Sequence, residues 1–167
     1  MTRALLVRIT LAVLSAAQNL VATPAAAQSA TASFQVSANV IKTCSISATN
    51  VAFGNYDPVV ANDTIAADQT GTVTIRCTRG TAWSVALDDG SNFLGGRRMQ
   101  LGATGEYLPY ELYSDAGRTV VWNAGAPQTG TAASRAAVPL TVYAQVPAGQ
   151  DAAAGAYLDT VVATITF

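Results

Sequence analysis

The sequence contains no histidine, and only 11% of its 167 residues are charged. The absence of histidine removes the commonest general base, catalytic-triad member and zinc ligand. Lys42 is the only lysine, and the Arg97–Arg98 pair is too small a basic patch to indicate a polyanionic partner. We therefore expect neither an enzyme nor a nucleic-acid-binding protein, and we expect no cofactor.

Cysteine is also scarce, since Cys44 and Cys77 are the only two. An even pair in an exported chain favours a disulfide, whereas two cysteines without histidine make a poor metal site. Cys77 lies in an alternating segment, residues 71–78, in which Val73 and Ile75 share its inward face. It can therefore meet Cys44 in the core, and no metal site is expected.

No apolar run reaches the length needed to span a bilayer. The apolar stretch Ile9–Ala17 follows Arg3 and lies beside Arg8, and the small residues Ala25–Ala27 come after it. This pattern is typical of a secretory signal peptide, residues 1–27. The remaining 140 residues begin at Gln28 and carry 7 basic and 10 acidic residues, a net charge of −3. We expect one domain, exported to the periplasm and not inserted in a membrane after signal removal.

Convincing amphipathic helices are lacking, because glycine or proline interrupts each alanine-rich stretch every few residues. Short segments with a period of two residues, separated by turns, predict strands instead. Their order predicts an all-β fold, an antiparallel β-sandwich. Residues 53–58 are predicted to be rich in turns and residues 123–137 to form a loop. The predicted strands are residues 34–40, 44–48, 71–78, 83–87, 99–101, 107–113, 119–122, 138–146 and 157–167.

Two of these strands have no evident partner. The last one, residues 157–167, is followed by no segment that could cover its edge, and the leading one, residues 34–40, has no obvious hairpin partner. Exposed apolar strand edges favour pairing between molecules. We therefore expect an incomplete sheet that is completed by addition of a strand. The side chains on one face of the last strand are Val161, Ala163, Ile165 and Phe167, and those of the leading strand are Phe34, Val36, Ala38 and Val40.

Three groups of residues have a possible chemical role, and in each a structural role is favoured. Glu106 and Glu111 could form a carboxylate pair for glycoside hydrolysis, but no other catalytic residues accompany them, so surface or hydrogen-bonding roles are preferred. The stretch 88–90 lacks the spaced ligands of a calcium loop and is predicted to be a hairpin turn. Three tyrosines could form a sugar-binding platform, although core or edge packing is preferred: Tyr107, Tyr110 and Tyr113.

A series of short segments in a fixed order covers nearly all of the mature chain. On these segments the chain resembles the spore coat protein U family, which includes the major pilin of archaic chaperone–usher pili. The segments are residues 34–40, 44–46, 53–54, 73–77, 85–90, 110–115 with Arg118, 138–140, 155–161 and 164–167.

The resemblance implies an incomplete immunoglobulin-like sandwich that lacks its last strand. In such pilins a periplasmic chaperone first fills the groove beside the C-terminal strand, and the N-terminal strand of the next subunit then replaces it at the outer-membrane usher. Carried over to this chain, residues 28–42 are the donor segment and residues 43–167 the pilin-like domain. The donor side chains would be Phe34, Val36, Ala38 and Val40, the acceptor groove would include Val161, Ala163, Ile165 and Phe167, and Cys44–Cys77 would be the disulfide.

The leading functional hypothesis is a structural subunit that polymerises head to tail by donor-strand exchange and supports adhesion or biofilm at the cell surface. Its expected partners are the chaperone, the usher and identical or related subunits. The alternative is a secreted coat protein whose own leading strand completes its sheet, without a chaperone–usher fibre. A third hypothesis is a carbohydrate-binding module that uses the tyrosines. Ala38 is small for a donor position, which suggests a weaker anchor.

Overall fold

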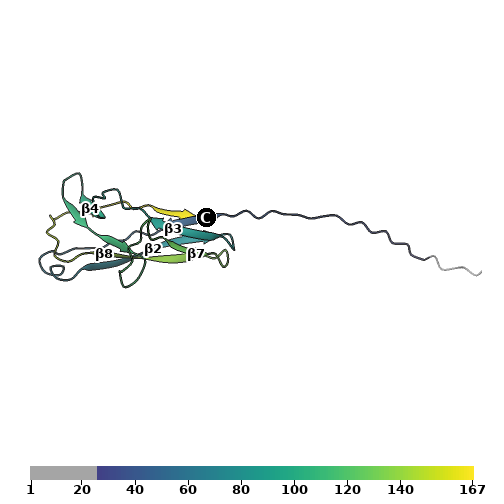
Figure 1. Cartoon of the computed structure of the whole chain (residues 1–167), viewed down its shortest axis with the longest axis horizontal. Coiled ribbons are helices and arrows are strands. Elements are labelled where there is room, and N and C mark those ends of the chain that lie inside the picture. The colour runs from purple at the N-terminus through teal and green to yellow at the C-terminus, as the bar shows by residue number, and fades with distance from the viewer. Residues whose placement is uncertain (1–25) are drawn as a thin grey trace, which may run out of the picture. The chain divides into compact units, whose positions relative to one another are not determined.

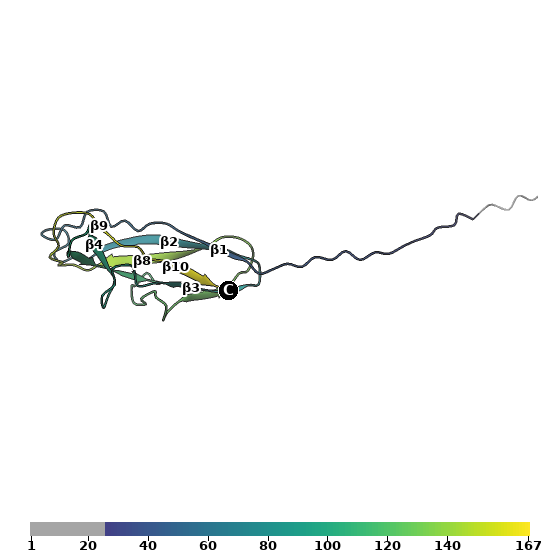
Figure 2. The ribbon, with the colours of Figure 1, turned by 90° about the horizontal axis from the view of Figure 1, so that it is seen from above.

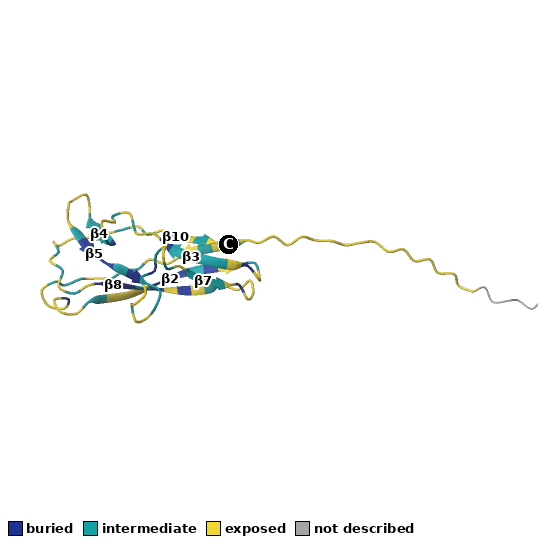
Figure 3. Ribbon diagram, viewed as in Figure 1, coloured by how far each residue is buried: buried dark blue, intermediate teal, exposed yellow. Residues whose placement is uncertain are grey.

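The computed structural model describes residues 26–167. Apart from its last two residues, the predicted signal peptide therefore lies outside the described residues. The chain divides into two units, and residues 39–167 form the second, larger one. Residues 26–43 are all exposed and form no strand (Figure 3). Among residues 26–167, no helix is long and apolar enough to cross a membrane.

The second unit is built from three antiparallel sheets (Figure 1). The largest contains, in spatial order, β1 (Cys44–Ala48), β2 (Ala67–Cys77), β8 (Val138–Val146) and β6 (Glu111–Tyr113). The second contains β10 (Ala163–Thr166), β3 (Ala82–Leu87) and β7 (Gln128–Thr131). The third contains β5 (Tyr107–Pro109), β4 (Arg98–Leu101) and β9 (Tyr157–Leu158). The predicted all-β antiparallel fold is therefore confirmed.

The core lies between the largest sheet and the other two. Side chains of β2 and β8 alternate between buried and exposed, as the period of two predicts. They pack against Val85 and Leu87 of β3 and against Leu108 of β5. Trp122 is completely buried among them, and its Nε1 donates a 2.8 Å hydrogen bond to the carbonyl of Val85. This bond satisfies the one polar atom of the indole and connects the segment after β6 to the second sheet.

The predicted disulfide is present between Cys44 and Cys77, which face one another in the register of β1 and β2. It closes a loop with a sequence separation of 33. We expect the double variant Cys44→Ala/Cys77→Ala to lose about 3–4 kcal/mol of unfolding free energy, because the unfolded chain gains the entropy of that loop. Urea unfolding measures the loss, and the parent chain in reducing buffer should match the variant. An unchanged midpoint would contradict this prediction.

Several predicted boundaries differ from the structure. The strand predicted at 71–78 is β2 and begins at Ala67, and the strand predicted at 119–122 is only an isolated bridge between Tyr113 and Val121. The predicted loop 123–137 contains β7, and the predicted strand 107–113 is divided by Tyr110 into β5 and β6, which join different sheets. The predicted terminal strand 157–167 is divided into β9 and β10, also in different sheets. The predicted leading strand 34–40 is absent, and its large side chains are exposed. This last difference has a simple physical reason, since a strand needs a hydrogen-bonded neighbour and this segment has none among the described residues.

Arg97 is a buried charged residue in the region where the three sheets meet. Its Nη1 lies 2.6 Å from Oε1 of Glu111, and its Nη2 donates to the carbonyl oxygens of Asp88 and, at 2.9 Å, Trp122. One guanidinium therefore joins the end of β3, the start of β6 and the segment that carries Trp122. Sequence reasoning assigned Arg97 no structural role, because a doublet with Arg98 looks like a surface patch.

We expect Arg97→Met to lower the free energy of unfolding by about 3–5 kcal/mol, because it leaves a carboxylate and two carbonyl oxygens without their shared donor. Its neighbour supplies the control. Arg98 lies over the ring of Tyr107, 3.6 Å from the centroid, and Arg98→Met should lose only about 1 kcal/mol. Chemical denaturation of both variants measures the difference, and equal losses would refute the structural role of Arg97.

Candidate functional site: a groove between two strand edges

Two of the edge strands, β1 of the largest sheet and β10 of the second sheet, lie beside one another. Among the described residues, β1 is hydrogen-bonded only to β2, and β10 only to β3. Figure 2 shows β1 and β10 next to one another at one end of the domain. Cys44 begins β1 and Thr166 ends β10 at this same end, because the short connection 78–81 joins β2 to β3 there. The two free edges therefore face each other and run in opposite directions.

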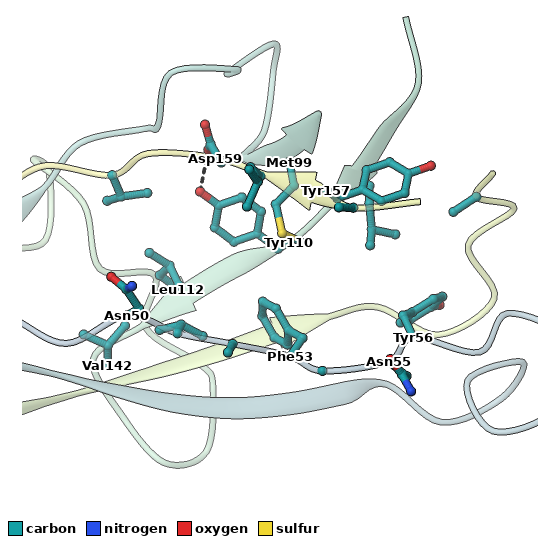
Figure 4. Close-up of a pocket in the computed structure, with 18 of the residues that line it drawn as sticks. Asn50, Phe53, Asn55, Tyr56, Met99, Tyr110, Leu112, Val142, Tyr157 and Asp159 are labelled. Carbon is teal, nitrogen blue, oxygen red and sulfur yellow. Dashed lines mark hydrogen bonds between the residues drawn. The ribbon is translucent and has the colours of Figure 1, made fainter. Parts of the chain in front are cut away.

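Toward the opposite end of the domain the two edges separate, and a groove of about 920 Å³ opens between them. One wall is the segment 48–56, which follows β1, and the other is the segment 152–159 with Val161 and Ala163. Figure 4 shows Phe53 and Met99 pointing toward one another from opposite sides of this space. The floor consists of core side chains: Val73, Leu87, Leu108, Leu112 and Val142. The groove therefore reaches down to the hydrophobic core, whose floor side chains are each only 2–5% exposed.

The backbone along both walls is largely unpaired. In the described part of the chain, residues 50–56 and 154–156 make no backbone hydrogen bond. Free N–H and C=O groups on both sides of an apolar floor are what a strand needs in order to bind. The groove can therefore hold an extended peptide, with main-chain bonds to its walls and side chains on its floor.

One polar cluster lies beside this apolar floor. The Tyr110 hydroxyl donates a 2.6 Å hydrogen bond to Oδ2 of Asp159 (Figure 4). Oδ1 of Asp159 accepts hydrogen bonds from the backbone N and from Nδ2 of Asn92. Gly90 has φ +83°, and a Cβ there would lie 2.2 Å from Oδ2 of Asp159. The close packing fixes the chain just before β10 and therefore positions one wall of the groove.

Burial, and then the bond to Asp159, raise the pKa of Tyr110 far above its ordinary value of 10.0. A raised pKa in the folded state means that this group's stabilising effect is complete below pH 10 and is lost as the pH rises above it. We expect the melting temperature to fall steeply above pH 10, and less steeply in Tyr110→Phe. Circular dichroism melts between pH 8 and 11.5 measure both slopes, and parallel slopes would contradict this assignment.

The segment 88–90 also holds the second wall. Oδ1 of Asp88 accepts hydrogen bonds from the backbone N of Gly90 at 3.0 Å and of Val162 at 2.9 Å, and the backbone N of Asp88 donates to the Val162 carbonyl. The predicted hairpin turn is wrong, because the flanking strands β3 and β4 belong to different sheets and do not pair. The segment 88–90 instead fastens the residues that lead into β10, which the sequence did not indicate. No cluster of three potential metal ligands occurs within residues 26–167.

The four predicted acceptor residues lie in different surroundings. Val161 and Ala163 line the groove, Ile165 packs against the core beyond it, and Phe167 is 55% exposed at the end of β10. The assignment of all four to an acceptor groove stays a prediction. The donor side chains Phe34, Val36, Ala38 and Val40 are all exposed, and their role also stays a prediction.

The carboxylates and tyrosines considered for a chemical role are not gathered into one site. Glu111 is paired with Arg97, whereas Glu106 is exposed. The tyrosines do not form one exposed platform, because Tyr110 is buried and Tyr107 stacks on Arg98. Sequence reasoning missed most of the groove lining: Phe53, Leu87, Met99, Tyr110 and Tyr157. Met99 looked like an ordinary strand residue. The other four lie in segments that carried the resemblance, but nothing in those segments marked them as groove residues.

Comparison with known proteins agrees with this architecture. Residues 30–164 match the family model described as Spore Coat Protein U domain. Protein U of Myxococcus xanthus is 38% identical over 179 aligned positions, which cover 96% of this chain and 98% of that protein.

Among solved structures, a match occurs with the CsuC–CsuE chaperone–tip adhesion subunit pre-assembly complex from archaic chaperone–usher Csu pili of Acinetobacter baumannii. The TM-score is 0.54 at 20% identity, and the match covers 77% of this chain and 40% of that chain. This chain thus spans less than half the length of the matched one, and the likeness concerns the fold. The Hda pilus minor tip subunit HdaB of E. coli is more distant, with a TM-score of 0.39 at 17% identity over 72% of this chain and 79% of that chain. The predicted immunoglobulin-like antiparallel fold is confirmed.

Proposed function

Because this chain belongs to the spore coat protein U family, we propose that it is a structural subunit of a surface pilus or coat. In this proposal the N-terminal segment of one subunit, residues 28–42, fills the groove of the next. The observation that carries it is the pair of unpaired edges on β1 and β10, with an open apolar groove that continues from them. Residues 34–40 alternate as a strand does, but they are exposed and form no strand with any described residue.

The energetics favour filling the groove. Insertion of a strand buries Phe34, Val36 and Val40, with a smaller share from Ala38, which gives about 5–8 kcal/mol from burial alone. Hydrogen bonds to the unpaired walls add to this. Donor and acceptor lie on opposite parts of one chain, so repeated addition is heterologous and produces a fibre rather than a closed ring.

An open groove also explains the proposed need for assembly partners. Before polymerisation the apolar floor and free edges would favour aggregation. A periplasmic chaperone that lends a strand would protect them, and an outer-membrane usher would exchange that strand for the next subunit's segment. The assembled fibre would then support adhesion or biofilm at the cell surface.

The second candidate is a secreted coat protein that completes its own sheet. It is favoured by one observation, the 38% identity to a relative named Protein U rather than to a pilin. In this case residues 28–42 would fold back into the groove of their own domain, and the protein would remain monomeric.

The test is the assembly state of the mature chain, residues 28–167, purified after export. A fibre subunit should give a ladder of oligomers that resist SDS at room temperature and dissociate on boiling. A single monomeric species by light scattering, with protected residues 34–40 in hydrogen exchange, would instead identify the self-completed coat protein.

A further inference from the structure

One end of the domain carries exposed aliphatic side chains on an ordered loop, residues 57–66, here called the tip loop. Val59 is 80% exposed, Val60 77% and Ile65 67%. The tip loop lies at the end away from Cys44, because it connects the segment after β1 to the start of β2. Soluble domains seldom hold several large aliphatic side chains in water on one short loop without a partner for them.

The tip loop is held by a dense set of hydrogen bonds. Oδ1 of Asp57 accepts from the backbone N of Val59 at 3.0 Å and of Val60 at 3.1 Å. Asn62 exchanges bonds with the backbone of Asp57 at 2.7 and 2.9 Å, and its carbonyl accepts from Gly149 at 2.8 Å. The N–H donors of the two valines lower the pKa of Asp57, so the carboxylate that organises the loop stays charged at neutral pH. Val59 and Val60 are therefore presented in a fixed position, which reduces the entropy lost when they bind.

The opposite end of the domain carries the root of the N-terminal segment. The Thr78 backbone N donates to the Thr43 carbonyl at 2.9 Å, and the Thr78 hydroxyl donates to the Ile41 carbonyl at 3.1 Å. These bonds continue the pairing of β1 with β2 and hold residues 41–43 on the β2 side of β1. We call this the root end; Ile41 and Phe167 are exposed there.

The chain between donor segment and domain is short. Val40, the last predicted donor residue, is four residues before Cys44, the first residue of β1, so their Cα atoms are at most about 14 Å apart. A subunit that donates residues 34–40 must therefore place its root end directly at one end of the neighbour's groove. The direction in which the donor strand runs decides which end that is.

The groove itself leads to the tip loop. Tyr56 and Pro58 line it and are followed directly by Val59 and Val60. A donor strand that runs in the direction of β1, and so antiparallel to β10, brings the donating subunit's root end onto this loop. The opposite direction brings two root ends together and leaves the tip loop in water.

We propose that the tip loop of each subunit docks on the root end of the subunit that donates a strand to it. In this contact, Val59 and Val60 of the accepting subunit pack against the exposed side chains at the root end of a second copy of the chain. Those side chains are Ile41 and Phe167. The inference rests on the proposed strand donation and adds a second apolar contact between neighbours, which limits bending at each junction.

Cross-linking of assembled mature subunits tests this contact. Subunits carrying Val60→Cys are mixed before assembly with subunits carrying Ile41→Cys, and a short bismaleimide is added; the native cysteines do not react because they form the disulfide. We expect dimers that survive boiling in SDS only in the mixture. Val120→Cys replaces Val60→Cys as the control, since Val120 is an exposed valine beside β6, on the sheet edge opposite β1.

The outcomes separate this inference from the proposed function. Cross-links of Ile41→Cys subunits with one another, or an SDS-resistant ladder without any cross-link, would overturn the docking and leave strand donation standing. Absence of a ladder in the parent chain would overturn both. As a second measurement, Val59→Ser/Val60→Ser should leave the ladder intact and reduce the persistence length of the fibres at least twofold in electron micrographs. Val120→Ser should not change it, and an unchanged double variant would count against the docking.

Discussion

A mature chain with Val36→Asp is expected to remain monomeric under conditions in which the parent chain forms an SDS-resistant ladder. Val36 lies near the centre of the proposed donor segment, 28–42, and in that proposal its replacement brings a carboxylate onto the apolar floor of the groove. The variant loses about 1.5–3 kcal/mol of burial and must also desolvate a charge that has no cationic partner there. Together these effects should reduce assembly by several orders of magnitude.

The control is the adjacent substitution Gln35→Asp, which adds the same charge to the opposite face of the same segment. It should assemble nearly as well as the parent. A synthetic peptide of residues 28–42 should bind Val36→Asp subunits, whose grooves remain empty, and raise their melting temperature. A ladder from Val36→Asp, or equal loss in both variants, would show that residues 34–40 do not donate as proposed.

The second large effect is expected from Ala163→Asp, which should abolish acceptance of a strand while leaving donation intact. Ala163 lines the groove on β10, where a carboxylate would occupy the path of the incoming side chains. Thr164→Asp is the matched control, because the next residue of β10 points to the exposed face. The thermal stability of both variants should be recorded first, so that a loss of folding is distinguished from a blocked groove.

Mixing the two defective subunits then tests the direction of transfer. A Val36→Asp subunit can accept but not donate, and an Ala163→Asp subunit can donate but not accept. The mixture should therefore form heterodimers and no longer species, because the only free donor segment in a heterodimer carries Val36→Asp and the only free groove carries Ala163→Asp. If both variants are folded and their mixture contains only monomers by measured mass, completion of each sheet by its own chain would be favoured.

Strands in which every second side chain is buried could be predicted from the alternation in their sequence. The alternation of Val73, Ile75 and Cys77 predicted the central strand β2, and β8 has the predicted bounds, 138–146. The strand β7 was missed because Gln128–Thr131 has no apolar alternation. It pairs with β3 because Gly130 has no side chain: a Cβ there would lie 2.5 Å from the Trp83 ring. That fit depends on a residue 47 positions away in sequence, which no local pattern contains.

The sequence predicted the edge strand β10 beside the groove, but it did not predict most of the residues that line the groove. The unpaired last strand followed from its alternating residues and is represented by β10, but the division before it depends on Asp159, which binds Asn92 and Tyr110 from distant segments. Residues 53–56 looked like turn residues, and residues 50–52 carried no signal, because this part of the groove wall pairs with no strand in the described structure and so has no period of its own. In the proposed assembly it would become regular only on binding a partner strand.

The position of the only lysine has a consequence for how an assembled fibre would break down. Lys42 is exposed and lies between the donor segment and β1. A lysine-specific protease therefore has one cleavage site in the chain, and a single cut there separates the donor strand from the domain that supplied it. Each domain would keep its neighbour's strand in its groove and remain folded, while every covalent connection along the fibre would be lost. Proteolysis at this one peptide bond would turn a fibre into separate, stable subunits.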